Sequence, residues 1–292
     1  MSGPLPSHGS RDRSAGPAGG ITGSEGPAPT APARVPMYVV DAFADRIFTG
    51  NPAAVCLLEH WLPDPVLRSI AAENNLSETA FVVRGAGCHS LRWFTPEVEV
   101  DLCGHATLAA AHVLYTQEGS GGEILRFETR SGTLSVTRHD DWIRLDFPSR
   151  PAEDCEMPAD LETGLGRAPR RVARSRDYLA VFETEAEVRG LTPDFTALAR
   201  VDALGIIATA PGDTCDFVSR FFAPRAGIPE DPVTGSAHCT LIPYWSARLD
   251  RRDLVARQVS RRGGELRCED RGGRVGILGQ AVTYSIGSIR IA

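Results

Sequence analysis

Two stretches of this sequence place acidic, histidine and serine side chains beside a short glycine turn. The first reads Asp-Leu-Cys-Gly-His-Ala-Thr over residues 101–107, and the second reads Glu-Asp-Pro-Val-Thr-Gly-Ser-Ala-His over residues 230–238. A Phe-x-Pro tripeptide precedes each stretch, at residues 94–96 and 222–224. Each glycine opens an apolar, helix-like run, and the free N–H groups at a helix start bind carboxylates and developing enolates. The pattern therefore predicts two helix N-termini that share one cleft for a small anion and for proton transfer.

The residues of the two turns are candidates for holding a substrate. Backbone N–H groups at Gly104 and Gly235 can donate to a carboxylate, and the Ser236 hydroxyl can add another donor. His105 can act as a general acid or as a hydrogen-bond donor to substrate. The alternatives are two ordinary glycine turns with a capping serine and a structural histidine. The shared Phe-x-Pro leaders favour the functional interpretation.

Glu78 is the candidate base. It follows Asn-Asn-Leu-Ser over residues 74–77 and opens an apolar segment. Burial beside apolar residues would raise the pKa of a carboxyl group toward neutrality, so that one side chain could both take and give a proton. The alternative is an exposed glutamate without a role. The adjacent Ser77 is a candidate for substrate binding.

Other polar residues near the turns have weaker assignments. Asp231 can orient an amino or hydroxyl group of the substrate, or serve only as a turn residue. Cys103 can be an acid/base thiol with a pKa lowered by the helix N-terminus, or a small buried residue. Asp101, His238 and Arg92 are expected to support the site or the fold.

Several common catalytic patterns are missing from the sequence. There is no Gly-x-Gly-x-x-Gly after the first strand, no phosphate-binding Walker loop and no Gly-x-Ser-x-Gly elbow. No His/Asp/Glu cluster has the spacing of metal ligands. We therefore expect chemistry without a cofactor or a metal.

Composition narrows the class of protein. The 292 residues are 42% hydrophobic and 23% charged with a net charge of −6, typical of a globular protein that binds neither nucleic acid nor a membrane. No apolar run is long enough to span a bilayer. Seven cysteines at scattered spacing argue against a disulfide framework and favour reduced thiols in the cytoplasm.

The order of predicted elements indicates a duplicated domain. Residues 1–36 are rich in Gly, Pro, Ser and Ala and are expected to form a disordered leader. The rest divides into half-domains 37–150 and 151–292, whose glycine turns lie about 130 residues apart, and whose last strands can cross back to the first half. Strands outnumber helices, and each half has one apolar helix, at 106–115 and 237–247. This predicts an α+β fold in which a curved, mostly antiparallel sheet surrounds a central helix in each half.

Taken together, these motifs resemble the PhzF (phenazine biosynthesis-like) isomerase family. The resemblance runs from about residue 37 to the end of the chain, and its motifs occur in the family's order. They lie at residues 40–43, 50–55, 75–79, 101–107, 230–237, 271–275 and 279–282.

The resemblance implies a diaminopimelate epimerase-like fold with pseudo-twofold symmetry, an active site between the halves, and a homodimer. The phenazine member isomerises trans-2,3-dihydro-3-hydroxyanthranilate by cofactor-free proton transfer; its acid/base glutamate matches Glu78. Its substrate-contacting His, Asp and Ser match His105, Asp231 and Ser236. Diaminopimelate epimerase uses two cysteines, and Cys103 lies where the first would be. Because the second turn offers Val233 and Thr234 instead, two-thiol racemisation is not expected.

The sequence thus predicts an isomerase in which Glu78 alone moves a proton on a small, unsaturated cyclic carboxylic acid in a biosynthetic pathway. Two alternatives stay open. Proton abstraction beside a carbonyl can also lead to dehydration or C–C cleavage, a lyase- or hydrolase-type outcome on the same fold. A non-catalytic binding protein that kept the fold is the other.

Overall fold

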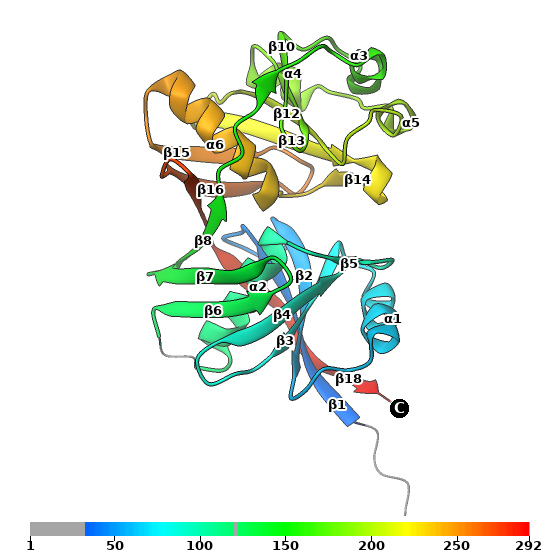
Figure 1. The fold of residues 1–292 in the computed structure, drawn as a ribbon, viewed down its shortest axis with the longest axis vertical. Coiled ribbons are helices and arrows are strands. Elements are labelled where there is room, and N and C mark those ends of the chain that lie inside the picture. Colours follow the sequence, from blue (N-terminus) through cyan, green and yellow to red (C-terminus); the bar gives the residue numbers. More distant parts are fainter. Residues whose placement is uncertain (1–32, 120–121, 292) are drawn as a thin grey trace, which may run out of the picture.

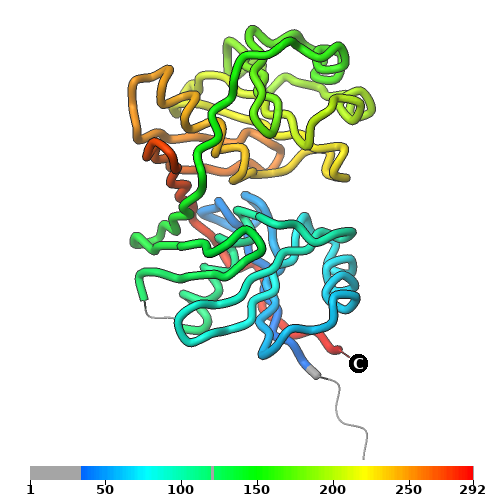
Figure 2. Tube along the Cα trace, in the orientation of Figure 1, coloured from blue at the N-terminus to red at the C-terminus, as the bar shows by residue number. Residues whose placement is uncertain are grey.

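The chain folds into two halves of similar construction, one above the other in Figure 1. The structure is a computed structural model that describes residues 33–119 and 122–291. The first half is drawn in blue to green, and the second in green to orange. The Cα trace in Figure 2 shows that the red C-terminal segment runs from the second half back into the first.

Among its described residues, the first half contains eight strands and two helices. Its strands are β1 (Ala33–Ala42), β2 (Asn51–Leu58), β3 (Glu78–Val83), β4 (His89–Phe94), β5 (Glu99–Val100), β6 (Ile124–Thr129), β7 (Gly132–His139) and β8 (Trp142–Pro148). Its helices are α1 (Asp64–Asn74) and α2 (Gly104–Thr116). Helix α2 is alanine-rich and almost wholly buried, since it packs against β1, β2, β3 and β8.

The second half repeats this plan with additional short helices. Its strands are β9 (Glu153–Asp154), β10 (Arg171–Arg174), β11 (Tyr178–Val181), β12 (Ile206–Pro211), β13 (Phe217–Ala223), β14 (Ile228–Asp231), β15 (Asp253–Gln258), β16 (Gly264–Asp270), β17 (Arg274–Gly279) and β18 (Ala281–Ile291). Its helices are α3 (Ala159–Leu165), α4 (Glu185–Arg189), α5 (Phe195–Leu198), the 3₁₀ turn η1 (Pro224–Ala226) and α6 (Gly235–Leu249).

Strand pairing follows the same order in the two halves. In the first, β2 pairs in parallel with β3, and β4 with β6, while the remaining neighbours are antiparallel. In the second, β11 pairs in parallel with β12, and β13 with β15. Helix α2 connects β4 and β5 to β6, and α6 connects β13 and β14 to β15. The two helices that begin at the glycine turns therefore hold equivalent places.

The halves are joined by an exchange of strands. Strand β8 pairs antiparallel with β17, so the sheet continues from one half into the other. After β8 the chain passes to the second half, where β9 pairs with β10. After β17 it returns, and β18 pairs along the whole length of β1. Strand β18 thus forms an edge next to β1 of the first half, whereas β8 lies between β7 and β17 and links the two halves.

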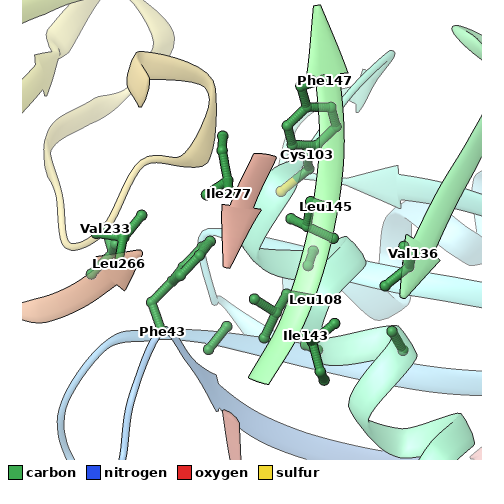
Figure 3. Close-up of a cluster of buried hydrophobic side chains, with 14 of the residues drawn as sticks. Phe43, Cys103, Leu108, Val136, Ile143, Leu145, Phe147, Val233, Leu266 and Ile277 are labelled. Atoms are coloured by element: carbon green, nitrogen blue, oxygen red, sulfur yellow. The ribbon is translucent and has the colours of Figure 1, made fainter. Parts of the chain in front are cut away.

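A buried apolar cluster spans the junction. Figure 3 shows the side chain of Phe43 between residues of the two halves, with Leu108 and Leu145 on one side and Val233 and Leu266 on the other. Residues from both halves belong to the same hydrophobic cluster. This shared core fixes the relative positions of α2 and α6.

The predicted α+β fold with two pseudo-symmetric halves is confirmed, and both central helices form where expected. The leader was extended too far, because residues 33–36 belong to β1 and pair with β18; residues 1–32 lie outside the described residues. The segment that connects the halves contains the two-residue strand β9. Helices α3, α4 and α5 were not predicted; they are short, with four to seven residues each.

Among the described residues, no helix has both the length and the apolar character needed to cross a membrane.

Candidate active site

The N-termini of helices α2 and α6 are in contact through their first residues, Gly104 and Gly235. A Cβ atom on Gly104 would lie 3.3 Å from the Cα of Gly235, and one on Gly235 would lie 3.4 Å from the Cα of Gly104. Both contacts are tighter than ordinary carbon contacts, so only glycine lets the backbones approach this closely. The positive ends of two helix dipoles are thereby directed at one small region.

Glu78 and His105 face each other beside this meeting point. Glu78 is the first residue of β3, and His105 is the second residue of α2. Glu78 Oε2 lies 3.1 Å from His105 Nε2, and the two side chains are only 12% and 5% exposed. The contact lacks good hydrogen-bond alignment, since Glu78 Oε2 has no aligned partner among the described residues. The predicted base and the predicted histidine are therefore adjacent, and the carboxylate keeps an oxygen lone pair available.

Asn51 connects this pair to Asp231. Its Nδ2 lies 3.2 Å from His105 Nδ1 and donates to Asp231 Oδ1 at 2.8 Å and to the Val233 carbonyl at 2.9 Å. Asn51 and His105 belong to the first half, whereas Asp231 and Val233 belong to the second. A single buried amide group therefore bridges the halves at the centre of the site.

Asp231 is buried at the end of β14 and is surrounded by donors. Thr234 Oγ1 donates to its carboxylate, and Gln258 Nε2 donates to its backbone carbonyl at 2.7 Å. Burial raises the pKa of Asp231 to about 6, against the opposing effects of His105, Thr234 and Asn51; the charge of Glu78 adds to the increase. Asp231 can thus hold a proton under mildly acidic conditions.

Burial, the contact between His105 and Cys103, and the nearby Glu78 together determine the pKa values of His105 and Cys103. Burial alone would lower the pKa of His105, but the nearby Glu78 carboxylate and the close contact with Cys103 outweigh this effect and hold the pKa above its ordinary value. Cys103 Sγ lies 3.5 Å from His105 Nδ1. Burial and the charge of Glu78 raise the pKa of Cys103 to about 11. Of the two alternatives for Cys103, this agrees with a small buried residue and not with a thiol of lowered pKa, because desolvation outweighs the effect of the helix N-terminus.

Ser236 lies at the start of α6 and accepts a hydrogen bond from Arg176 Nη2 at 3.1 Å. Arg176 is also paired with buried Asp177 at 2.9 Å. Ser236 is equivalent to His105, because each follows the first glycine of its helix. Ser77 is partly buried directly before Glu78.

The residues expected to support the site have separate surroundings. Arg92 pairs with Glu99 and Asp64, and the side chain of Asp101 is exposed. His238 is buried in α6, where its Nδ1 lies 2.8 Å from the Thr234 carbonyl. These contacts hold neighbouring elements together and do not reach Glu78.

Comparison with known proteins identifies the family. The family model described as phenazine biosynthesis-like protein matches residues 40–287. This chain belongs to that family. It is 53% identical over 257 residues to an uncharacterized isomerase of Pseudomonas aeruginosa, across 88% of this chain and 98% of the relative.

Solved structures agree with the family assignment. A PhzF family protein of Enterococcus faecalis superposes with a TM-score of 0.87 at 48% identity, over 89% of this chain and all of that one. A probable proline racemase from Agrobacterium radiobacter, at 11% identity over 88% of this chain and 93% of that one, has a TM-score of 0.60. The second likeness concerns the fold alone and relates this family member to the racemase architecture.

The two halves of this family member differ at the position of Glu78. Phe94 and Phe222 open the two Phe-x-Pro motifs; they pair with Thr79 and Ile206, respectively. The preceding residues are Glu78 in the first half and Gly205 in the second. Likewise the N-caps of α2 and α6 are Cys103 and Thr234. Neither a second carboxylate nor a second thiol stands at the equivalent positions.

Asn51 and Gln258 were missed as site residues. The sequence shows Asn51 only as part of a Gly-Asn-Pro turn, and its partners Asp231 and Val233 lie about 180 residues away. Gly50 adopts a φ of +65° and donates its N–H to the Gly263 carbonyl. Arg262 donates to the carbonyls of Thr49 and Gly50. Gly50 could have indicated this role in the sequence, because a glycine-dependent turn fixes the position of the Asn51 side chain that follows it.

Glu78, Cys103 and His105 also form a group whose donor atoms all lie within 4.8 Å of one another, within the part of the chain that the structure describes. Sequence spacing did not reveal this group because Glu78 comes from a different element. A metal there would need the Cys103 thiolate and an unprotonated His105 nitrogen. The same three side chains can also take part in proton transfer.

Proposed function

We propose that this protein is a cofactor-independent isomerase in which Glu78 moves a proton on a small, unsaturated cyclic carboxylic acid. The observation that carries the proposal is the nearly buried contact of Glu78 with His105 where two helix N-termini meet. The absence of an equivalent side chain at Gly205 supports a single base. Membership of the phenazine biosynthesis-like family, and relatives named as isomerases, agree with this activity.

In the proposed reaction, the Glu78 carboxylate removes a proton from an acidic C–H, and the electron pair of that bond passes into the conjugated system. The protonated Glu78 then returns the proton to a different carbon. Double bonds change place while every atom of the substrate is kept, so neither an oxidant nor a reductant is required. One side chain suffices because the two carbons belong to one bound molecule.

The surrounding groups would hold the substrate. Amide groups at Gly104 and Gly235, with the hydroxyl of Ser236, would bind its carboxylate through charge-assisted hydrogen bonds. His105 and Asp231 would orient the reacting ring, and a hydrogen bond from His105 would stabilise negative charge as it develops. Ser77 is proposed to contact the same substrate beside Glu78.

A substrate similar to trans-2,3-dihydro-3-hydroxyanthranilate fits these requirements, because it combines a carboxylate with an acidic ring carbon and conjugated double bonds. We place the reaction in a biosynthetic pathway. We also propose a homodimer in the cytoplasm. All seven cysteines are unpaired, which agrees with a reducing compartment.

Incubation with trans-2,3-dihydro-3-hydroxyanthranilate in deuterated water tests the proposal. We expect an isomer of unchanged composition, apart from deuterium exchanged at the carbon that receives the proton. A product that has lost water or a carbon fragment would indicate a lyase instead. Neither turnover nor label uptake, across a panel of cyclic unsaturated acids, would favour a binding protein.

A further inference from the structure

The amide of Asn51 can adopt only one orientation. Asn51 is fully buried, and its Nδ2 faces the Val233 carbonyl and Asp231 Oδ1. A backbone carbonyl only accepts hydrogen bonds, so a reversed amide would place oxygen against oxygen at 2.9 Å. Asn51 Oδ1 has no hydrogen-bond partner within the described ranges. The orientation is therefore fixed by the second half even though it leaves a buried oxygen unsatisfied.

This orientation presents an NH₂ group to one side of the His105 ring. Nδ1 lies 3.2 Å from Asn51 Nδ2 and 3.5 Å from Cys103 Sγ. A proton on Nδ1 would point toward the NH₂ group of Asn51, which is itself a donor. Without that proton, Nδ1 can accept a hydrogen bond from Asn51 or from Cys103. The two Asn51 hydrogens already have closer acceptors, and the Cys103 thiol can supply the remaining donor.

The opposite side of the ring faces an acceptor. His105 Nε2 lies 3.1 Å from the Glu78 carboxylate, which favours a proton on Nε2. We propose that Asn51 is a positioning residue: it keeps Nδ1 of neutral His105 unprotonated, so that the remaining ring proton sits on Nε2 and faces Glu78.

Titratable groups on three elements face this ring: Glu78 on β3, Cys103 before α2, and Asp231 on β14, which reaches His105 through Asn51. The negative charge of Glu78 favours a second proton on His105. The NH₂ group of Asn51 opposes a proton at Nδ1. Asn51 therefore determines which proton leaves first when His105 becomes neutral.

The consequence for catalysis rests on the proposed function. An Nε2–H donor beside Glu78 can stabilise the charge that develops on a substrate, whereas an Nδ1–H donor would point away from the base. Because Asn51 makes its bonds to Asp231 and Val233, the second half sets the protonation of a first-half histidine. This gives the two halves a shared role beyond packing.

Nuclear magnetic resonance of ¹⁵N-histidine-labelled protein tests the inference without any substrate. His105→Gln identifies the His105 signals, and a pH titration reports which nitrogen keeps its proton. Asn51→Asp places a carboxylate oxygen near Nδ1, and Asn51→Ala removes the amide. Asn74→Asp is the matched control, since Asn74 contacts Thr79 rather than His105.

In the wild type we expect the neutral ring to carry its proton on Nε2. Asn51→Asp should raise the pKa of His105 by about one unit or more and move the neutral proton to Nδ1. Asn51→Ala should give a mixture of both forms, and Asn74→Asp should match the wild type. If Asn51→Asp does not fold, the proton position and titration of His105 in Asn51→Ala test the inference.

A neutral wild-type ring with its proton on Nδ1 would overturn the inference. So would unchanged titration and unchanged proton position in the folded Asn51 variants. Because no substrate is present, these outcomes are independent of whether the proposed isomerase activity is found.

Discussion

Glu78 and Gly205 occupy equivalent positions in the two halves. Each directly precedes a strand residue that pairs with the phenylalanine of a Phe-x-Pro motif. A Cβ on Gly205 would lie 2.1 Å from Phe221, so the second half has no room there for a side chain in this arrangement. The backbone is duplicated, but the carboxylate is present once. A two-base mechanism would need a second group from elsewhere, and the N-cap of α6 supplies only Thr234.

Gly104→Ala should separate the two helix N-termini. Its Cβ would meet the Gly235 backbone at 3.3 Å and Phe147 at 3.4 Å. We expect a loss of about 1–3 kcal/mol in the free energy of unfolding, measured by urea denaturation, because of overpacking. Gly273→Ala is the control, since its Cβ would meet nothing within 4 Å. Equal stability of the two variants would contradict the close contact.

Arg262→Met should destabilise the turn that places Asn51. Arg262 donates to the carbonyls of Thr49 and Gly50 and pairs with buried Asp41 at 2.7 Å. Removing it leaves Asp41 without its cation, so we expect a loss on the order of 2 kcal/mol in the free energy of unfolding. Arg46→Met, at an exposed position of the same loop, should change stability little. A wild-type value for Arg262→Met would contradict this role.

Asp231 should make stability depend on pH. Its pKa rises from 3.8 to about 6 on folding, so the folded state binds this proton more tightly. The stabilising effect is complete below pH 3.8 and is lost as the pH rises through about 6, a change of about 3 kcal/mol. The stability of the wild type minus that of Asp231→Asn should fall by about 2 kcal/mol between about pH 4 and pH 7, because part of the change occurs below pH 4. A difference independent of pH would contradict the raised pKa.

Cys103→Ala should keep most of the activity. Burial holds the pKa of this thiol near 11, so little thiolate is present at neutral pH. We expect turnover within about tenfold of the wild type, since loss of a catalytic acid or base costs about a hundredfold or more. Steady-state kinetics at neutral pH would measure it. A loss as large as that of Glu78→Gln would make Cys103 a second base.

The sequence was sufficient for the parts of this protein that depend on local patterns. Glycine turns followed by apolar runs located α2 and α6, and the motif order led to the correct family and fold. Glu78 and His105, which the sequence indicated as separate candidates, lie side by side in the structure. The other residues around His105 could not be predicted from the sequence, because Asn51 and Asp231 come into contact only when both halves have folded.

The degree of burial of each side chain, and hence its desolvation, also could not be predicted from the sequence. The position of Cys103 before a helix suggested a lowered pKa, yet full burial raises it. The leader boundary was misplaced for a similar reason: residues 33–36 form a strand because distant β18 supplies their hydrogen-bond partners. Long-range pairing and burial depend on the complete fold.

The central claim is that Glu78 alone moves the proton, and Glu78→Gln tests it most directly. Turnover of trans-2,3-dihydro-3-hydroxyanthranilate, followed with deuterium uptake from labelled water, should fall by several orders of magnitude, roughly 10³-fold or more, with folding unchanged by circular dichroism. Glu73→Gln, at an exposed position of α1, should retain wild-type turnover. Near-wild-type turnover by Glu78→Gln would contradict the account.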